Sequence, residues 1–179
     1  MSQTTVTPKS RLKNPAMIVP EAMAPLQALG QLMGQLDGEP ARAHALALLR
    51  VSQLNGCALC LAGSCMTLRG FGESEERLFA VSAWRESTRF TAAERAALAL
   101  AEAMTRLSDR PDPVSDAVWD EAARHFGERE LALLVLGIGT MNLYNRINIT
   151  TRQVAAEWSG EEPAANALNS PRPLARSSK

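Results

Sequence analysis

The sequence predicts an all-α protein whose helices pack on one another in a single domain. Hydrophobic residues make up 46% of the 179 residues, and Ala and Leu, both strong helix formers, dominate that fraction. Aromatic residues account for only 4%, and no segment alternates apolar and polar residues as a half-buried strand does. Apolar residues instead recur at helical spacing between breaks. We expect the helical domain to cover residues 15–158, between unstructured segments at 1–14 and 159–179.

Prolines and glycines separate three predicted helices in the N-terminal half. The first begins between Pro20 and Pro25 and carries leucines at helical spacing as far as residue 36. The second covers about 41–54 and ends at Asn-Gly, because both residue types tolerate left-handed backbone angles. The third begins at or beside Cys57 and runs to about residue 69, where glycines follow.

Capping residues mark the next two helices. Ser74 opens a fourth helix that continues to Trp84, a residue that we expect to be a core anchor. Thr91 is followed three residues later by Glu94, which is the pattern of a capping box. The fifth helix therefore begins at this pair and reaches about residue 107.

Two helices complete the domain. The sixth is capped by Ser115 or Asp116, contains Trp119 as a second expected core anchor, and ends before a glycine. The seventh runs from near residue 128 to about 157 and contains Gly137 and Gly139. Glycine destabilises a helix interior, so these two residues predict a close approach by another helix.

The charge balance argues against several classes of function. Nineteen basic and nineteen acidic residues cancel, and no basic stripe favours nucleic acid. The longest apolar stretch is too short to span a membrane, and the first ten residues lack the apolar core of a secretory signal. We therefore expect a cytoplasmic protein with no membrane or nucleic-acid partner. Its near-zero net charge removes one barrier to self-association.

The cysteines are the chemically distinctive residues. All three lie between residues 57 and 65, which favours a local redox or metal role over a disulfide framework. The helix break before Cys57 places Cys57 and Cys60 in a first helical turn, where free backbone amides and the helix dipole stabilise a thiolate. Their spacing brings both onto one side of the helix, close enough for a disulfide after modest adjustment. This arrangement suits a cycle in which one thiolate attacks an oxidised substrate and the other resolves the product.

The cysteines also allow two other interpretations, as core residues or as metal ligands. Free cysteines are often simply buried core residues. A zinc site needs four ligands, and neither His44 nor His125 has ligand-like spacing to the pair, so we expect no metal and no cofactor. Ser64 lies one turn beyond Cys60 and could donate a hydrogen bond to a thiolate, whereas Cys65 lies roughly 140° round the helix from Cys60.

The chain resembles the carboxymuconolactone decarboxylase superfamily, in particular its alkylhydroperoxidase D-like (AhpD-like) branch. The matching motifs occur in order at residues 50–60, 83–86, 90–91, 94–98, 125–126 and 141–148. The resemblance implies a multi-helix bundle that assembles as a homotrimer or hexamer. It also implies peroxiredoxin-type antioxidant activity in which Cys60 attacks peroxide and Cys57 resolves. The substrate would be a small peroxide or disulfide, and the reductant a thiol protein or a lipoyl group.

The chain departs from this family at the proton relay. Members usually carry a histidine where this sequence has Ser64 and a glutamate where it has Ala45. Neither residue can act as a general base. His44 adjoins the missing glutamate but is turned about 100° round the helix; an exposed or helix-capping position is the expectation for it. Slow peroxidase or disulfide-exchange activity is therefore the prediction.

A non-catalytic helical oligomer with structural or oxidation-sensing cysteines is the alternative that the missing relay favours. Lactone decarboxylation is disfavoured, because decarboxylases of that type generally lack the Cys-x-x-Cys pair. Asn145 and Arg146 follow an apolar run and are expected to have a structural role, as buried polar groups that need partners. Asn148 begins an Asn-Ile-Thr triplet that matches a glycosylation acceptor by chance.

Overall fold

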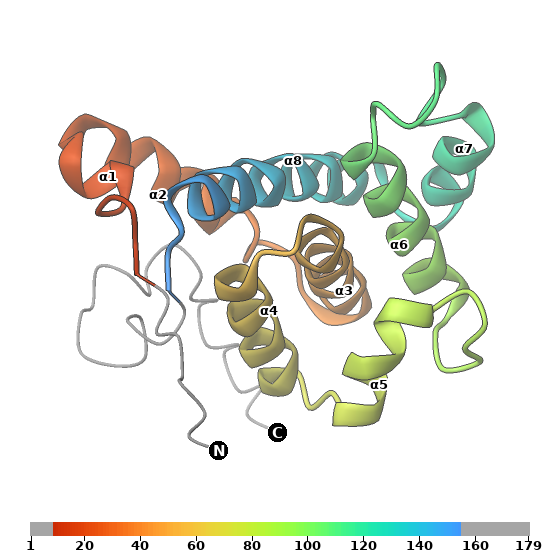
Figure 1. Ribbon diagram of the computed structural model, residues 1–179. Coiled ribbons are helices and arrows are strands. Elements are labelled where there is room, and N and C mark those ends of the chain that lie inside the picture. Colours follow the sequence, from red (N-terminus) through yellow and green to blue (C-terminus); the bar gives the residue numbers. More distant parts are fainter. Residues whose placement is uncertain (1–8, 155–179) are drawn as a thin grey trace, which may run out of the picture.

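The computed structural model describes residues 9–154, and every regular element in that range is a helix (Figure 1). The all-α fold class predicted from the sequence is confirmed for this part of the chain. The elements in chain order are α1 (Pro15–Ile18), η1 (Pro20–Ala22), α2 (Met23–Leu32), α3 (Gly38–Asn55), α4 (Ala58–Gly70), α5 (Glu75–Ala80), η2 (Val81–Ala83), α6 (Ala92–Thr105), α7 (Asp116–His125) and α8 (Glu128–Thr151).

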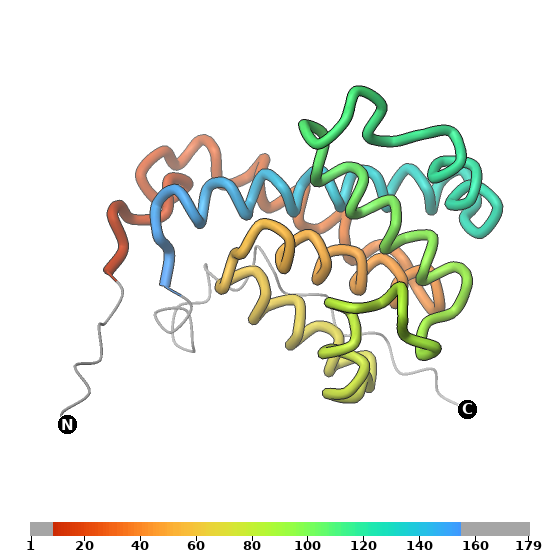
Figure 2. The backbone as a smooth tube through the Cα atoms, turned by 45° about the vertical axis from the view of Figure 1, so that its right-hand side comes forward, coloured from red at the N-terminus to blue at the C-terminus, as the bar shows by residue number. Residues whose placement is uncertain are grey.

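Helix α3 lies at the centre of the molecule and packs against α4, α6 and α8 (Figure 2). Ten of its residues, Ala41, Ala43 to Leu49, Val51 and Ser52, are buried. One apolar cluster joins α3 to α6, α7 and α8 and includes Cys57 and Cys60. A second cluster lies on the other side of α3, against α4, α5 and α6. Two apolar regions thus share one helix.

Several predicted helix ends are confirmed by their caps. The Thr91 hydroxyl accepts the Glu94 N–H, and the Glu94 carboxylate accepts the Thr91 N–H, which completes the capping box of α6. Gly56 ends α3 with a φ of 71°, a left-handed angle that glycine adopts without a steric penalty. Ser115 is the N-cap residue of α7, although its side chain makes no capping hydrogen bond.

Two helices are shorter than predicted. Helix α2 ends at Leu32, where hydrogen bonds from the backbone N–H groups of residues 33–35 form tight turns. Helix α8 ends at Thr151, whereas the sequence pattern extended it to about residue 157. Arg152 adopts a left-handed φ of 53°, and the Arg152 and Gln153 N–H groups bond back to carbonyls of the last turn. These bonds close the helix.

The two tryptophans that were expected in the core differ in exposure. Trp84 is buried, as expected of a core anchor, and its indole N–H donates to buried Glu102 over 3.0 Å. Trp119 is 43% exposed, so its assignment to the core is wrong. Helix α7 packs at the edge of the molecule through Ala122 and Val118, which leaves the indole at the rim.

The predicted close approach to α8 occurs at one of its two central glycines. A Cβ on Gly137 would lie 2.0 Å from Nε2 of His44, a residue of α3, whereas a Cβ on Gly139 would meet nothing within 4 Å. Residues 9–14 of the segment expected to be unstructured lie against the end of α8, where the Arg11 N–H donates to the Thr151 carbonyl. Among residues 9–154, no helix is long and apolar enough to cross a membrane.

Candidate functional site: a buried cysteine pair

The link between α3 and α4 positions the cysteine pair. The Cys57 N–H donates to the Ser52 carbonyl over 3.0 Å, which closes the turn at Gly56. Cys57 is then the N-cap residue of α4, and Cys60 lies in its first turn. Their Sγ atoms are 2.9 Å apart. The placement predicted from the sequence is therefore present, and the two thiols are in direct contact.

Amide groups surround the sulfurs. The Cys60 backbone N–H donates to Cys57 Sγ over 3.4 Å, in the manner of a helix cap. From α8, the Asn148 side-chain Nδ2 donates to Cys60 Sγ over 3.3 Å. The side chain of Asn145 also interacts with Cys60. These donors stabilise negative charge on either sulfur.

A network of asparagines holds these donors in place. Asn55 Nδ2 donates to the side-chain oxygens of Asn142 and Asn145 over 3.0 and 2.9 Å. Arg146 also donates to the Asn142 oxygen, over 2.9 Å. Because the Asn145 oxygen is taken by Asn55, its NH2 group points toward Ser52, at 3.5 Å. Asn145 is fully buried, so this network fixes which end of its amide faces the site.

The contact between the thiols separates their acidities. The hydrogen bond from Cys60 lowers the pKa of Cys57 below its ordinary value, against the effect of burial and with further help from the Cys60 N–H and Asn148. The same contact and burial raise the pKa of Cys60 well above its ordinary value. One proton is thus lost readily and the second is retained. This order is the reverse of the roles that the family resemblance implies.

Burial limits access to the pair. Cys57 is 2% exposed and Cys60 is 0% exposed. Tyr144 belongs to the same apolar cluster, and burial raises its pKa to about 12. Its hydroxyl donates to the Leu26 carbonyl over 2.5 Å, so its proton is directed away from the sulfurs. Asn148, whose amide contacts Cys60, remains partly exposed.

The predicted accessory residues are not brought to the sulfurs. Ser64 is buried, and within residues 9–154 its hydroxyl makes no hydrogen bond with either thiol. His44 is buried against Gly137, which corrects the expectation of an exposed or capping histidine. Burial lowers its pKa to about 4, and its Nε2 atom has no hydrogen-bond partner in the described part of the chain. Cys65 packs in the second apolar cluster, away from the pair.

Asn148 is the site residue that sequence reasoning missed. The Asn-Ile-Thr triplet indicates only a chance glycosylation match, yet the Asn148 amide contacts Cys60. The available signal was the interval of three between Asn142, Asn145 and Asn148, which places all three near one face of a helix. Among residues 9–154, no group of three or more His, Cys, Asp or Glu side chains is arranged to hold a metal ion.

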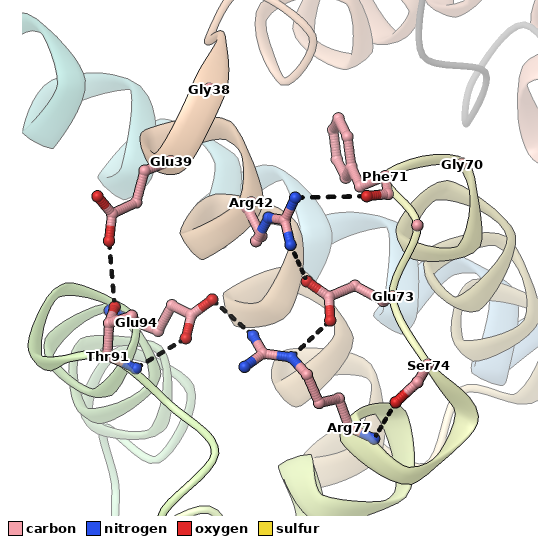
Figure 3. A pocket seen from close by; sticks show the side chains of 11 residues that line it. Gly38, Glu39, Arg42, Gly70, Phe71, Glu73, Ser74, Arg77, Thr91 and Glu94 are labelled. Carbon is pink, nitrogen blue, oxygen red and sulfur yellow. Dashed lines mark hydrogen bonds and ion pairs between the residues drawn. The ribbon is translucent and has the colours of Figure 1, made fainter.

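A separate cleft of about 730 Å³ lies between the starts of α3, α5 and α6 (Figure 3). Arg77 bridges Glu73 and Glu94 at 2.5 and 2.6 Å, and Arg42 pairs with Glu73 at 3.0 Å. The Thr91 hydroxyl bonds to Glu39, on the opposite wall. The two arginines pair with Glu73 and Glu94, and no thiol lines the cleft. The arrangement ties three helix starts together and does not resemble a reactive site.

Comparisons with known proteins agree with this architecture. The model of the carboxymuconolactone decarboxylase family matches residues 20–103. YdfG of Bacillus subtilis strain 168, an uncharacterized protein, is 36% identical over 108 residues, which are 60% of this chain and 72% of that protein. YnjA of Escherichia coli K12, also uncharacterized, is 36% identical over 105 residues, 59% of this chain and 56% of that protein.

A similar solved structure is that of a protein of unknown function from Agrobacterium tumefaciens, for which the role of an antioxidant defence protein AhpD has been suggested. It shares 32% sequence identity with this chain and has a TM-score of 0.74. The match covers 82% of this chain and 97% of the other.

Proposed function

Because the chain belongs to the carboxymuconolactone decarboxylase family, in its AhpD-like branch, we propose that it is a thiol-dependent oxidoreductase of the antioxidant, peroxiredoxin-activity type. The observation that carries this proposal is the contact between the Cys57 and Cys60 sulfurs at 2.9 Å at the start of α4. Amide donors from α4 and α8 stabilise the charge that such chemistry requires.

The proposed reaction reduces a small hydroperoxide or disulfide. A thiolate attacks the peroxide, the O–O bond breaks, and the products are a sulfenic acid and an alcohol. The second thiol then displaces the sulfenic oxygen as water and leaves a Cys57–Cys60 disulfide. A thiol protein or a lipoyl group returns two electrons and two protons to this disulfide. We expect the rate to be modest, because Ser64 and Ala45 cannot relay protons.

Steady-state consumption of tert-butyl hydroperoxide, with dihydrolipoamide as reductant, tests the proposal. Replacing either Cys57 or Cys60 by Ser should abolish turnover, while Cys65→Ser should retain it and serves as the matched control. Peptide mapping of the oxidised protein should find the Cys57–Cys60 disulfide. Unchanged turnover in the Cys60→Ser variant would remove the proposal.

Burial of the pair favours one alternative, a non-catalytic helical oligomer that senses oxidation through its cysteines. Such a protein would form the disulfide once, without sustained turnover under any reductant. Multiple turnovers in the same assay would exclude it. Either function is compatible with our further proposals, which are a cytoplasmic location and assembly as a homotrimer or hexamer. Analytical ultracentrifugation can test the oligomeric state.

A further inference from the structure

The hydroxyl groups of Ser52 and Tyr144, near the cysteine pair, donate their protons to backbone carbonyls and not to the sulfurs. Ser52 donates its hydroxyl proton to the Leu48 carbonyl over 3.1 Å, and Tyr144 donates its proton to the Leu26 carbonyl. His44 packs against Gly137 on the α3–α8 contact. The asparagines can donate hydrogen bonds but do not exchange protons as acids near neutral pH. Among residues 9–154, the proton retained on the pair is thus the one held next to a reacting sulfur.

We propose that Cys57 is the attacking sulfur and that Cys60 first gives its proton to the leaving group and then resolves the oxidised Cys57. This inference rests on the proposed function and assigns the roles within it. Cys57 Sγ is held at the helix N-cap by the Cys60 N–H, and Cys60 Sγ lies 2.9 Å away. The thiol of Cys60 is therefore placed to supply the proton that the leaving group needs.

The steps balance without any group from outside the site except the substrate and solvent. The Cys57 thiolate takes one oxygen from the hydroperoxide, and the O–O bond releases an alkoxide. Cys60 protonates the alkoxide, giving an alcohol and a Cys60 thiolate. That thiolate attacks the Cys57 sulfur, the S–O bond breaks, and the hydroxide that leaves takes up one proton from solvent, equal to the proton that Cys57 released when it ionised, and becomes water. Cys57 and Cys60 together lose two electrons, which reduce the peroxide.

Asn148 positions Cys60 for the second step. Its Nδ2 lies 3.3 Å from Cys60 Sγ, so it can stabilise the thiolate that appears once the proton has left. Asn145 approaches the same sulfur and is fixed by Asn55. Replacing Asn148 by Leu removes the donor; we expect disulfide formation to slow and the pH midpoint of thiol reactivity to rise. Restoration of both by Asn148→Gln would support positioning by the amide.

Two substrates with different leaving groups separate attack from proton transfer. Ellman's reagent releases a strongly acidic thiol that leaves without a proton, whereas tert-butyl hydroperoxide releases a basic alkoxide. All variants carry Cys65→Ser. The Cys60→Ser variant should react with Ellman's reagent within about tenfold of the parent rate, but with the hydroperoxide roughly a hundredfold more slowly, as expected on loss of a general acid. The Cys57→Ser variant should be slow with both.

Each result decides one point. Fast reaction of Cys57→Ser with Ellman's reagent, together with an inert Cys60→Ser, would overturn the inference and leave the dithiol function standing. If the Cys60→Ser variant reacted more slowly than the parent by the same factor with both substrates, the acid role of Cys60 would be overturned. A parent protein inert to both would refute the function itself. If the variants do not fold, limited alkylation of the parent at neutral pH decides instead: Cys57 should be labelled first, and labelling of Cys60 first would contradict the inference.

Discussion

The contact between α3 and α8 at Gly137 makes a sharp prediction about stability. A Cβ at this position would lie 2.0 Å from His44 Nε2 and 2.8 Å from Cε1. Non-bonded atoms rest at about 3.5 Å, so the imidazole or the helix must move by about 1.5 Å. His44 is only 2% exposed and cannot swing into water. Overpacking of this kind costs about 1–3 kcal/mol, and better helix propensity returns roughly 0.5–1 kcal/mol.

We therefore expect Gly137→Ala to lower the free energy of unfolding by about 1–2 kcal/mol, measured by urea denaturation with circular dichroism. Gly139 is the matched control on the same helix, because a Cβ there meets nothing within 4 Å. Gly139→Ala should raise stability by roughly 0.5–1 kcal/mol. Adding His44→Ala should relieve the clash in the Gly137 variant. A Gly137→Ala protein as stable as the parent would refute the packing argument.

Other stability measurements test other features of the fold. Burial lowers the pKa of His44 from 6.5 to about 4 in the folded protein. The contribution of neutral His44 to the free energy of unfolding should therefore be fully present above pH 6.5 and should fall by about 3 kcal/mol as the pH drops to 4. A pH series on His44→Gln should show a smaller decline. Thr91→Ala removes a capping box and should cost about 1 kcal/mol in thermal or urea unfolding, whereas Ser115→Ala, at a cap without a side-chain hydrogen bond, should change little. Trp84→Phe removes a hydrogen bond to a buried carboxylate and should cost about 1.5–3 kcal/mol, while Trp119→Phe, at a 43% exposed site, should stay within about 0.5 kcal/mol of the parent. Equal effects within either pair would contradict these assignments.

Local signals in the sequence were sufficient for most of the fold. The Thr91 capping box and the glycine after α3 act through hydrogen bonds within a few residues, so both could be read directly. The position of Trp119 could not be predicted from local sequence, because its exposure depends on how α7 packs at the edge of the molecule. The true end of α8 depends on the left-handed Arg152, a residue type without a strong preference for that conformation.

The candidate site was predictable only in part, because some of its contacts join segments that are distant in the chain. A helix break followed by Cys57 and Cys60 predicts two thiols in one helical turn, and the structure shows their contact. Asn148 comes from a helix distant in the chain, so its contact with Cys60 required the packing of α8 against α4. The order of acidity was also out of reach, because it depends on which sulfur occupies the N-cap and which donates the shared proton.

Loss of the relay residues changes how the site must work without removing the conditions for thiol chemistry. A general base is needed when a thiol of ordinary acidity must be ionised at the moment of reaction. Here the contact with Cys60 and the first turn of α4 lower the pKa of Cys57 below its ordinary value, because they stabilise its negative charge. The Cys57 thiolate therefore forms more readily than that of an ordinary cysteine. What the site still needs is a proton for the leaving group, and Cys60 carries one at 2.9 Å.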